Sequence, residues 1–232
     1  ETVNTLQTIS RVNRQRAISV TANLADGASQ AAALEQARRI AVEVLPPGYT
    51  FSFEGGARTF QESFDSLAFA FVLGLIVAYM VLASQFNSFI HPFTVLLAVP
   101  FSITGALLAL RVTDQSLNLY SAIGVILLMG IAKKNSILLV EFANQQREQG
   151  LSVRDALLTA GPIRLRPILM TSMATLTAAL PLALGLGAGA ETRQPMAIAV
   201  LGGLVISTAF TLVVVPCAYS LLARFERKAP VA

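Results

Sequence analysis

The chain has 232 residues, of which 54% are hydrophobic and only 13% are charged, and its formal net charge is +4. Soluble domains carry about 25% charged residues, so this composition predicts an integral membrane protein. The single cysteine, Cys217, excludes an internal disulfide. The basic residues flank apolar segments and form no basic patch with interleaved aromatic residues, which argues against a nucleic-acid partner.

Residues 1–60 are the only part with a soluble-looking composition. Apolar residues alternate with others in 17–24 and again in 49–55, which predicts two strands. A helix is predicted between them, because four apolar residues recur at helical spacing before a Pro-Pro pair: Leu34, Ala37, Ala41 and Val44. This strand–helix–strand piece is too small to bury a core alone, so we expect other chain to complete its sheet.

Five apolar segments follow, and each comes close to or exceeds the roughly 20 residues that a membrane-spanning helix needs. They lie at about 67–83, 89–110, 120–142, 167–186 and 195–222. Pro100 and Pro181 fall inside spans, which membrane helices tolerate when neighbours satisfy the freed carbonyl groups. Pro167 is expected in the first turn of the fourth span. We therefore expect a transmembrane domain over residues 61–232.

The polar segment 143–166, between the third and fourth spans, contains a short helical pattern at 153–158. Two interpretations stay open for it. The segment forms an amphipathic helix on the cytoplasmic surface, or it is an ordinary polar connector.

The basic residues predict the orientation of the spans. If the first span enters the membrane from outside, the outer loops hold only Arg111 and Arg193. The inner loops then hold seven basic residues: Arg147, Arg154, Arg164, Arg166, Arg224, Arg227 and Lys228. This orientation places residues 1–60 outside the membrane, which is the periplasm if the source is a Gram-negative bacterium, and the C-terminus in the cytoplasm.

The stretch "GIAKKNSILLVEF" places charged residues inside the third span. Lys134 lies about 21 Å along this span, in the inner half of the bilayer but short of its end. Ionisable residues at such depths face the bundle interior and mark an ion or proton pathway, so Lys134 and its neighbour Asn135 are candidate functional residues. For Lys133, snorkelling to the headgroups and lining a polar interior both stay open.

A buried ammonium group needs an anionic partner, or it loses its proton. Glu141 is the only carboxylate well inside an apolar segment, but it lies about 10 Å along the helix axis from Lys134. Asp65 and Asp114 sit at the outer ends of spans. We therefore expect the partner carboxylate of Lys134 to come from another part of the protein.

Two more polar residues lie on one face of the fourth span, Arg164 at its inner end and Thr171 two turns deeper. On spacing alone both have ordinary explanations, since inner arginines set orientation and membrane threonines bond to their own backbone. The only histidine, His91, is expected at the membrane interface. No nucleophile–base constellation is present in the sequence, so the chain is not predicted to be an enzyme.

Four motifs, at the spacing they have here, resemble the C-terminal end of the resistance–nodulation–division (RND) efflux transporters, with the closest likeness to the multidrug, hydrophobe-exporting branch. They are "ASQFNSFIHPF", "GIAKKNSILLVEFA", "RLRPILMTS" and "GAGAETRQPMAIAVLGGL". The resemblance implies a mainly α integral membrane fold of twelve spans in two halves. This chain would hold spans eight to twelve, preceded by a small periplasmic β-α-β piece of a ferredoxin-like α+β porter subdomain.

The resemblance also implies export of drugs or other amphiphilic compounds by proton antiport, with the proton gradient as energy source and no cofactor. By motif position, Lys134 matches the family's central lysine, which pairs with two aspartates on the fourth span of the whole transporter. Asn135 matches its neighbour, and Arg164 and Thr171 match relay residues. Lys133 departs from the commonest family pattern, and Lys133 and Glu141 are kept as candidate accessory residues.

The implied partners are an N-terminal half with the acidic pair, two further copies in a homotrimer, a periplasmic adaptor, an outer-membrane channel and inner-membrane lipid. The polar start at Glu1, without Met, leads us to expect a piece of a longer polypeptide that does not pump alone. Two other interpretations stay open. One is a protein-translocation accessory of the same superfamily, and the other is a truncated, non-transporting membrane module.

Overall fold

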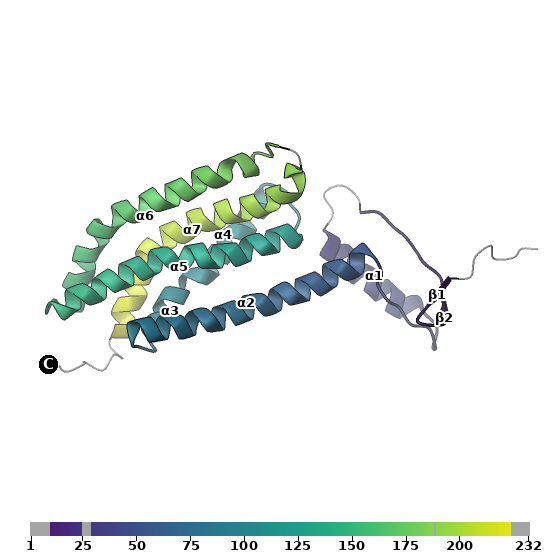
Figure 1. The fold of residues 1–232 in the computed structure, drawn as a ribbon, viewed down its shortest axis with the longest axis horizontal. Helices are drawn as coiled ribbons and strands as arrows, with labels where there is room; N and C mark the ends of the chain where they lie inside the picture. Colours follow the sequence, from purple (N-terminus) through teal and green to yellow (C-terminus); the bar gives the residue numbers. More distant parts are fainter. Residues whose placement is uncertain (1–9, 25–28, 188, 224–232) are drawn as a thin grey trace, which may run out of the picture.

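The computed structural model describes residues 10–24, 29–187 and 189–223, and these residues form a helical bundle with a small lobe at one end (Figure 1). The lobe comprises β1 (Ser10–Val12), β2 (Gln15–Ala17) and α1 (Gln30–Val44). The bundle comprises α2 (Gly56–Phe86), α3 (His91–Leu96), α4 (Ala98–Val112), α5 (Leu119–Glu148), α6 (Val153–Ala183) and α7 (Ala190–Leu222). The mainly α fold predicted from the sequence is confirmed.

The lobe differs from the predicted strand–helix–strand order. The helix lies where it was expected, since Ser29 caps α1 by accepting a hydrogen bond from the Ala32 amide. The strands do not, because 18–24 and 49–54 are irregular and the observed strands form a short antiparallel hairpin at 10–17. Strands need a neighbour to share backbone hydrogen bonds. Ile18 and Val20 are 90% and 91% exposed, and no strand among the described residues lies against them.

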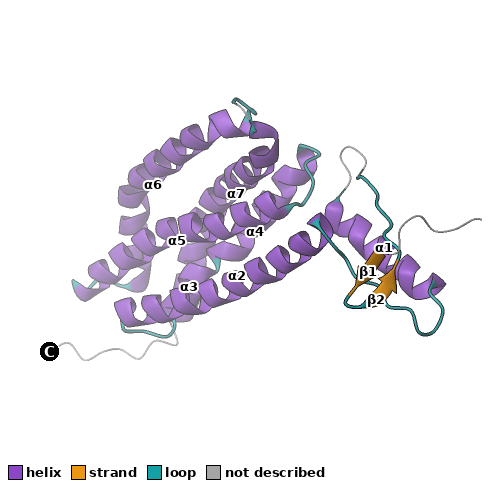
Figure 2. Ribbon diagram, turned by 45° about the vertical axis from the view of Figure 1, so that its right-hand side comes forward, coloured by secondary structure: helices purple, strands orange, loops and turns teal. Residues whose placement is uncertain are grey.

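Five helical segments are long and apolar enough to cross a membrane, as the sequence predicted. They are Gly56–Phe86, His91–Val112, Leu119–Glu148, Val153–Ala183 and Thr192–Leu222. The second consists of α3 and α4, which meet at Leu97. The first begins well before the apolar run, so α2 runs without a break from the lobe into the bundle (Figure 2).

The segment 143–166 is not a separate connector, although the helical pattern predicted at 153–158 coincides with the start of a helix. Helix α5 continues to Glu148, and α6 already begins at Val153, where the Ser152 hydroxyl accepts a hydrogen bond from the Asp155 amide. Pro167 therefore lies inside α6 and not in its first turn, together with Pro162 and Pro181. The polar residues around these prolines made the segment look like a loop, but a membrane helix tolerates interior prolines when its neighbours satisfy the freed carbonyl groups.

Helix α7 packs against α4, α5 and α6. Glycines permit this close approach, because a Cβ atom on Gly203 would lie 2.8 Å from the Ser102 carbonyl oxygen of α4. A Cβ atom on Gly202 would lie 2.9 Å from the Gly105 carbonyl oxygen. Small residues at helix contacts are the usual means by which membrane helices approach each other closely.

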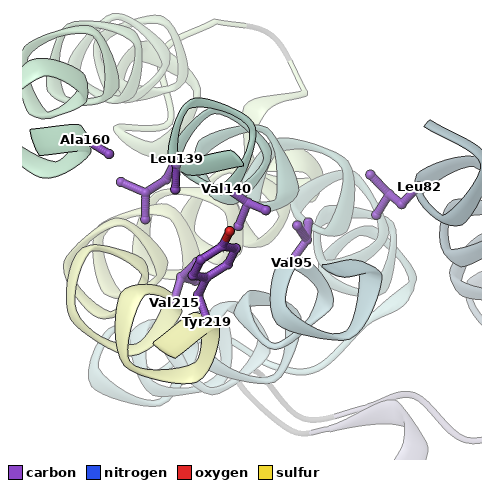
Figure 3. Close-up of a cluster of buried hydrophobic side chains, with 8 residues drawn as sticks. Leu82, Val95, Leu139, Val140, Ala160, Val215 and Tyr219 are labelled. Carbon is purple, nitrogen blue, oxygen red and sulfur yellow. The ribbon is translucent and has the colours of Figure 1, made fainter. Parts of the chain in front are cut away.

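One end of the bundle is closed by a cluster of buried side chains around Tyr219, which is 1% exposed (Figure 3). The cluster includes Leu82 of α2, Val95 of α3, Val140 of α5 and Ala160 of α6. His91 also belongs to this end. It is 4% exposed and stacks on Tyr219, so it is packed inside the protein at the first residue of the second span.

Candidate functional site

Three successive residues of α5 point in different directions, because an α-helix turns by about 100° per residue. Asn135 faces the helix bundle and is only 5% exposed. Lys134 is exposed within this chain, and Lys133 is half-buried. Lys134 lies near the middle of α5, but its side chain is not packed inside this set of helices. The surroundings of the Lys134 side chain in a membrane therefore depend in part on the lipid or protein that covers this face of α5.

Lys134 and Asn135 line a cavity of about 270 Å³. Helices α5, α6 and α7 form its wall, with Gly130, Ile131, Thr171, Ser172, Thr175 and Leu204 as the other lining residues. Three of the four predicted relay residues thus share one cavity: Lys134 and its neighbour Asn135 from α5, and Thr171 from α6. Lys133 and Glu141 are not among its lining residues.

A closed ring of three hydrogen bonds lies at the wall of this cavity. The Asn135 side-chain nitrogen donates to the Ser172 hydroxyl over 3.2 Å and to the Thr208 hydroxyl over 3.5 Å. The Ser172 and Thr208 oxygens are 3.1 Å apart and form a hydrogen bond of their own. The ring joins α5, α6 and α7, and its members are 5%, 5% and 7% exposed.

Thr171 lies one residue before Ser172 but takes no part in this ring. Its hydroxyl donates to the Ile168 carbonyl oxygen over 3.1 Å, and the neighbouring Thr175 hydroxyl donates to the Thr171 carbonyl over 2.8 Å. These are the local bonds that a threonine forms in a membrane helix. A hydroxyl that donates to its own helix still has lone pairs, so Thr171 can accept a hydrogen bond from a donor in the cavity.

Arg164 lies outside the cavity, in the first half of α6 and near Ala160 of the Tyr219 cluster. Its guanidinium carbon is 4.4 Å from the centre of the Phe142 ring, which is a cation–π contact between α6 and α5. The Arg164 Nε atom is buried and finds no hydrogen-bond acceptor among the described residues. The structure therefore separates the predicted set into three cavity residues and one arginine held on an aromatic face.

Within the described residues, Lys134 and Glu141 form no ion pair, and no three His, Cys, Asp or Glu side chains gather into a possible metal site. Arg224, Arg227 and Lys228, on which part of the orientation argument rests, lie outside the described residues. Ser172 and Thr208 were missed by the sequence reasoning. The only signal for them was a hydroxyl inside each of two predicted spans, which is common in membrane helices.

The cavity that Lys134 lines lies among helices that are long and apolar enough to cross a membrane. Residues 1–223 match the model of the AcrB/AcrD/AcrF family, and the chain belongs to this family of RND transporters. The resemblance seen in the four motifs is thereby confirmed at the level of the family. Its members are transporters, and the five apolar helices indicate a multi-pass inner-membrane protein.

Two solved structures show the same fold. The chain is similar to a heavy metal efflux pump in its crystal form II, with 30% identity and a TM-score of 0.74. That match covers 84% of this chain and 20% of the pump. It is also similar to crystal form I of a heavy metal efflux pump, with 30% identity, a TM-score of 0.71, and coverage of 84% and 19%. The chain thus spans about a fifth of the length of these pumps.

Proposed function

We propose that the chain is the C-terminal part of a proton-driven efflux pump, in which Lys134, Asn135, Thr171 and Arg164 take part in proton coupling. The observation that supports this most directly is the cavity shared by Lys134, Asn135 and Thr171, from two separate helices. A membrane scaffold has no use for an ammonium group at this depth, where a charge is costly. A transporter does, because such a charge can be paired and released in turn.

The proposed chemistry is an exchange of partners by one ammonium group. Lys134 forms ion pairs with carboxylates from the rest of the polypeptide while these are deprotonated. When the carboxylates take up protons they no longer hold a charge, and the Lys134 ammonium turns to neutral acceptors of the cavity. The Asn135 amide oxygen and the Thr171 hydroxyl are the acceptors that line it. Because α5 and α6 carry these groups, the exchange shifts the two helices against each other.

Arg164 has a different place in the proposal. Its position in the N-terminal half of α6, with an unsatisfied buried Nε atom, fits a cation that stabilises negative charge near the proton exit. We place the N-terminal end of α6 in the cytoplasm and residues 1–60 in the periplasm, on the distribution of basic residues. Trimerisation and docking to an adaptor and an outer-membrane channel extend the proposal to the assembled pump.

The substrate class has two candidates. The sequence motifs favour drugs or other amphiphilic compounds, whereas the two similar solved structures are heavy metal efflux pumps at 30% identity. Proton coupling is common to both candidates, so the relay residues do not decide between them. A pump-deficient bacterium that expresses the full-length protein decides it. Resistance to ethidium but not to Cu²⁺ supports the first candidate, and the reverse result supports the second.

The coupling itself is tested with Lys134→Ala in the full-length pump. We expect loss of resistance in whichever assay the wild-type pump confers it, with unchanged amounts of protein in the membrane. Asn135→Leu, which removes the neutral acceptor, is expected to lower resistance in the same assay. Wild-type resistance in a normally expressed Lys134→Ala strain would refute the proposal. A secretion defect without any change in efflux would instead favour the protein-translocation accessory.

A further inference from the structure

The hydrogen-bond ring of Asn135, Ser172 and Thr208 has a consequence for the direction of the Asn135 side chain. A primary amide has two N–H donors on one side and a carbonyl oxygen on the other. The Asn135 nitrogen donates to both hydroxyls, so the donor side of the amide faces Ser172 and Thr208. The oxygen therefore points away from Ser172 and Thr208, and it accepts no hydrogen bond from the described residues. Since Asn135 lines the Lys134 cavity, that oxygen is an acceptor available there.

We propose that Ser172 and Thr208 are positioning residues of the Lys134 site, which hold the Asn135 amide with its oxygen toward the cavity. This inference rests on the proposed proton coupling and adds two residues to it. Neither residue has to meet a proton or the substrate. Their role is to keep one amide in one orientation, because an amide with free donors would rotate and present N–H groups to an ammonium that needs an acceptor.

The ring also connects α5 and α6 to α7. Its Ser172–Thr208 contact uses one of the two hydroxyl hydrogens. The hydroxyl hydrogen left over belongs to whichever of Ser172 and Thr208 does not donate to the other. Ser172 lines the cavity and Thr208 does not, so the spare hydrogen can face the cavity only when Thr208 is the donor. The direction of the Ser172 hydroxyl at the cavity is thereby linked to the Thr208 hydroxyl of α7.

The test uses Thr208→Val in the full-length pump, because valine keeps the shape of threonine and removes its hydroxyl. The matched control is Thr211→Val, one turn further along α7. Thr211 is also buried, at 4% exposed, but its hydroxyl donates only to the Thr208 backbone carbonyl. On α6, Ser172→Ala is paired with Thr177→Val, whose hydroxyl donates to the Met173 carbonyl on the exposed face. Transport of ethidium and of Cu²⁺ is measured first for the wild type and for Lys134→Ala. The other variants are then compared with the substrate whose transport Lys134→Ala lowers.

We expect Thr208→Val and Ser172→Ala each to lower the transport rate by about three- to tenfold, the range given by loss of one hydrogen bond. We also expect the pH of half-maximal transport to move by about half a unit or more, since the acceptor for Lys134 is altered. Thr208→Ser restores the hydroxyl and should restore both. The double variant should be little worse than either single one, because both break the same ring.

Three results are decisive. If Thr208→Val and Ser172→Ala match Thr211→Val and Thr177→Val in rate and pH profile while Lys134→Ala is inactive, the positioning role is refuted and the proton coupling stands. If Lys134→Ala transports normally, the coupling is refuted and the positioning role with it. If Thr208→Val does not reach the membrane, Ser172→Ala and Thr208→Ser decide the question, and an unchanged pH profile in Ser172→Ala refutes the role.

Discussion

His91 and Tyr219 lie face to face at one end of the bundle, with ring centres 5.4 Å apart and ring planes inclined by only 7°. The Tyr219 hydroxyl donates to the Asn144 side-chain oxygen and accepts a hydrogen bond from Arg147 over 3.0 Å. His91 of α3 and Tyr219 of α7 are therefore connected to the last turns of α5, within the apolar cluster at this end of the bundle.

The first prediction concerns this tie. Tyr219→Phe keeps the ring stack and removes both hydroxyl hydrogen bonds at a site that is 1% exposed. We expect a loss of about 1–3 kcal/mol of stability, measured by thermal unfolding of the full-length protein in detergent. The control is Tyr79→Phe, whose hydroxyl donates to the Phe89 carbonyl at an exposed position. Equal unfolding temperatures for the two variants would contradict the prediction.

The second prediction concerns the approach of α7 to α4. Gly203→Ala adds a methyl group that would lie 2.8 Å from the backbone oxygen of Ser102, which cannot move aside as a flexible side chain can. We expect destabilisation by about 1–3 kcal/mol, since overpacking forces the backbone apart. Gly130→Ala is the matched control, because a Cβ atom there meets nothing within 4 Å. The prediction fails if both variants melt at the same temperature in detergent.

The third prediction separates the two adjacent lysines. Lys134 lines the cavity and Lys133 does not, so only the first has a place in the proposed coupling. We expect Lys133→Ala to keep transport within about twofold of wild type, because Lys133 does not line the cavity, while Lys134→Ala abolishes it. The measurement is efflux by the full-length pump at matched membrane amounts. Loss of transport in Lys133→Ala would show that the accessory role considered for Lys133 is real.

The fourth prediction concerns Arg164, which rests on the Phe142 ring. Arg164→Lys keeps the charge but loses the planar guanidinium that stacks on an aromatic face, so we expect lower transport, by about three- to tenfold. Arg166→Lys is the control, since Arg166 is exposed on the same turn. The comparison is made by initial efflux rates. Equal efflux rates for the two variants would contradict the prediction, because they would mean that transport needs only the positive charge of Arg164.

The spans were predictable because the signal for a membrane helix is local. A run of about 20 apolar residues is sufficient, and the helices that contain Leu67–Ala83 and Tyr120–Phe142 appear where the runs are. The strands at 17–24 and 49–55 were wrong because alternation indicates which face a strand would bury, not whether a partner strand is present. The start of α6 was missed because Pro162 and Pro167 signal a break in soluble helices that neighbours can prevent in a membrane.

The candidate site was predictable in part for a similar reason. Lys134 and Asn135 were found because a charge inside an apolar run is costly and rare, so it stands out in the sequence. Ser172 and Thr208 carry no such cost, since a hydroxyl in a membrane helix can donate to its own backbone. Only the packing of α5, α6 and α7 shows that their hydroxyls meet one amide instead. Arg164 was found by motif resemblance, and its contact with Phe142 required the folded chain.

Helix α2 has 31 residues, so it is about 46 Å long, whereas the apolar part of a bilayer is about 30 Å thick. Its first turns, with the Arg58–Glu62 ion pair, therefore extend beyond the lipid on the side of the small lobe. No flexible joint separates the part in lipid from the part in water. A tilt of α2, or its displacement along its own axis, would therefore also move the residues that precede Gly56.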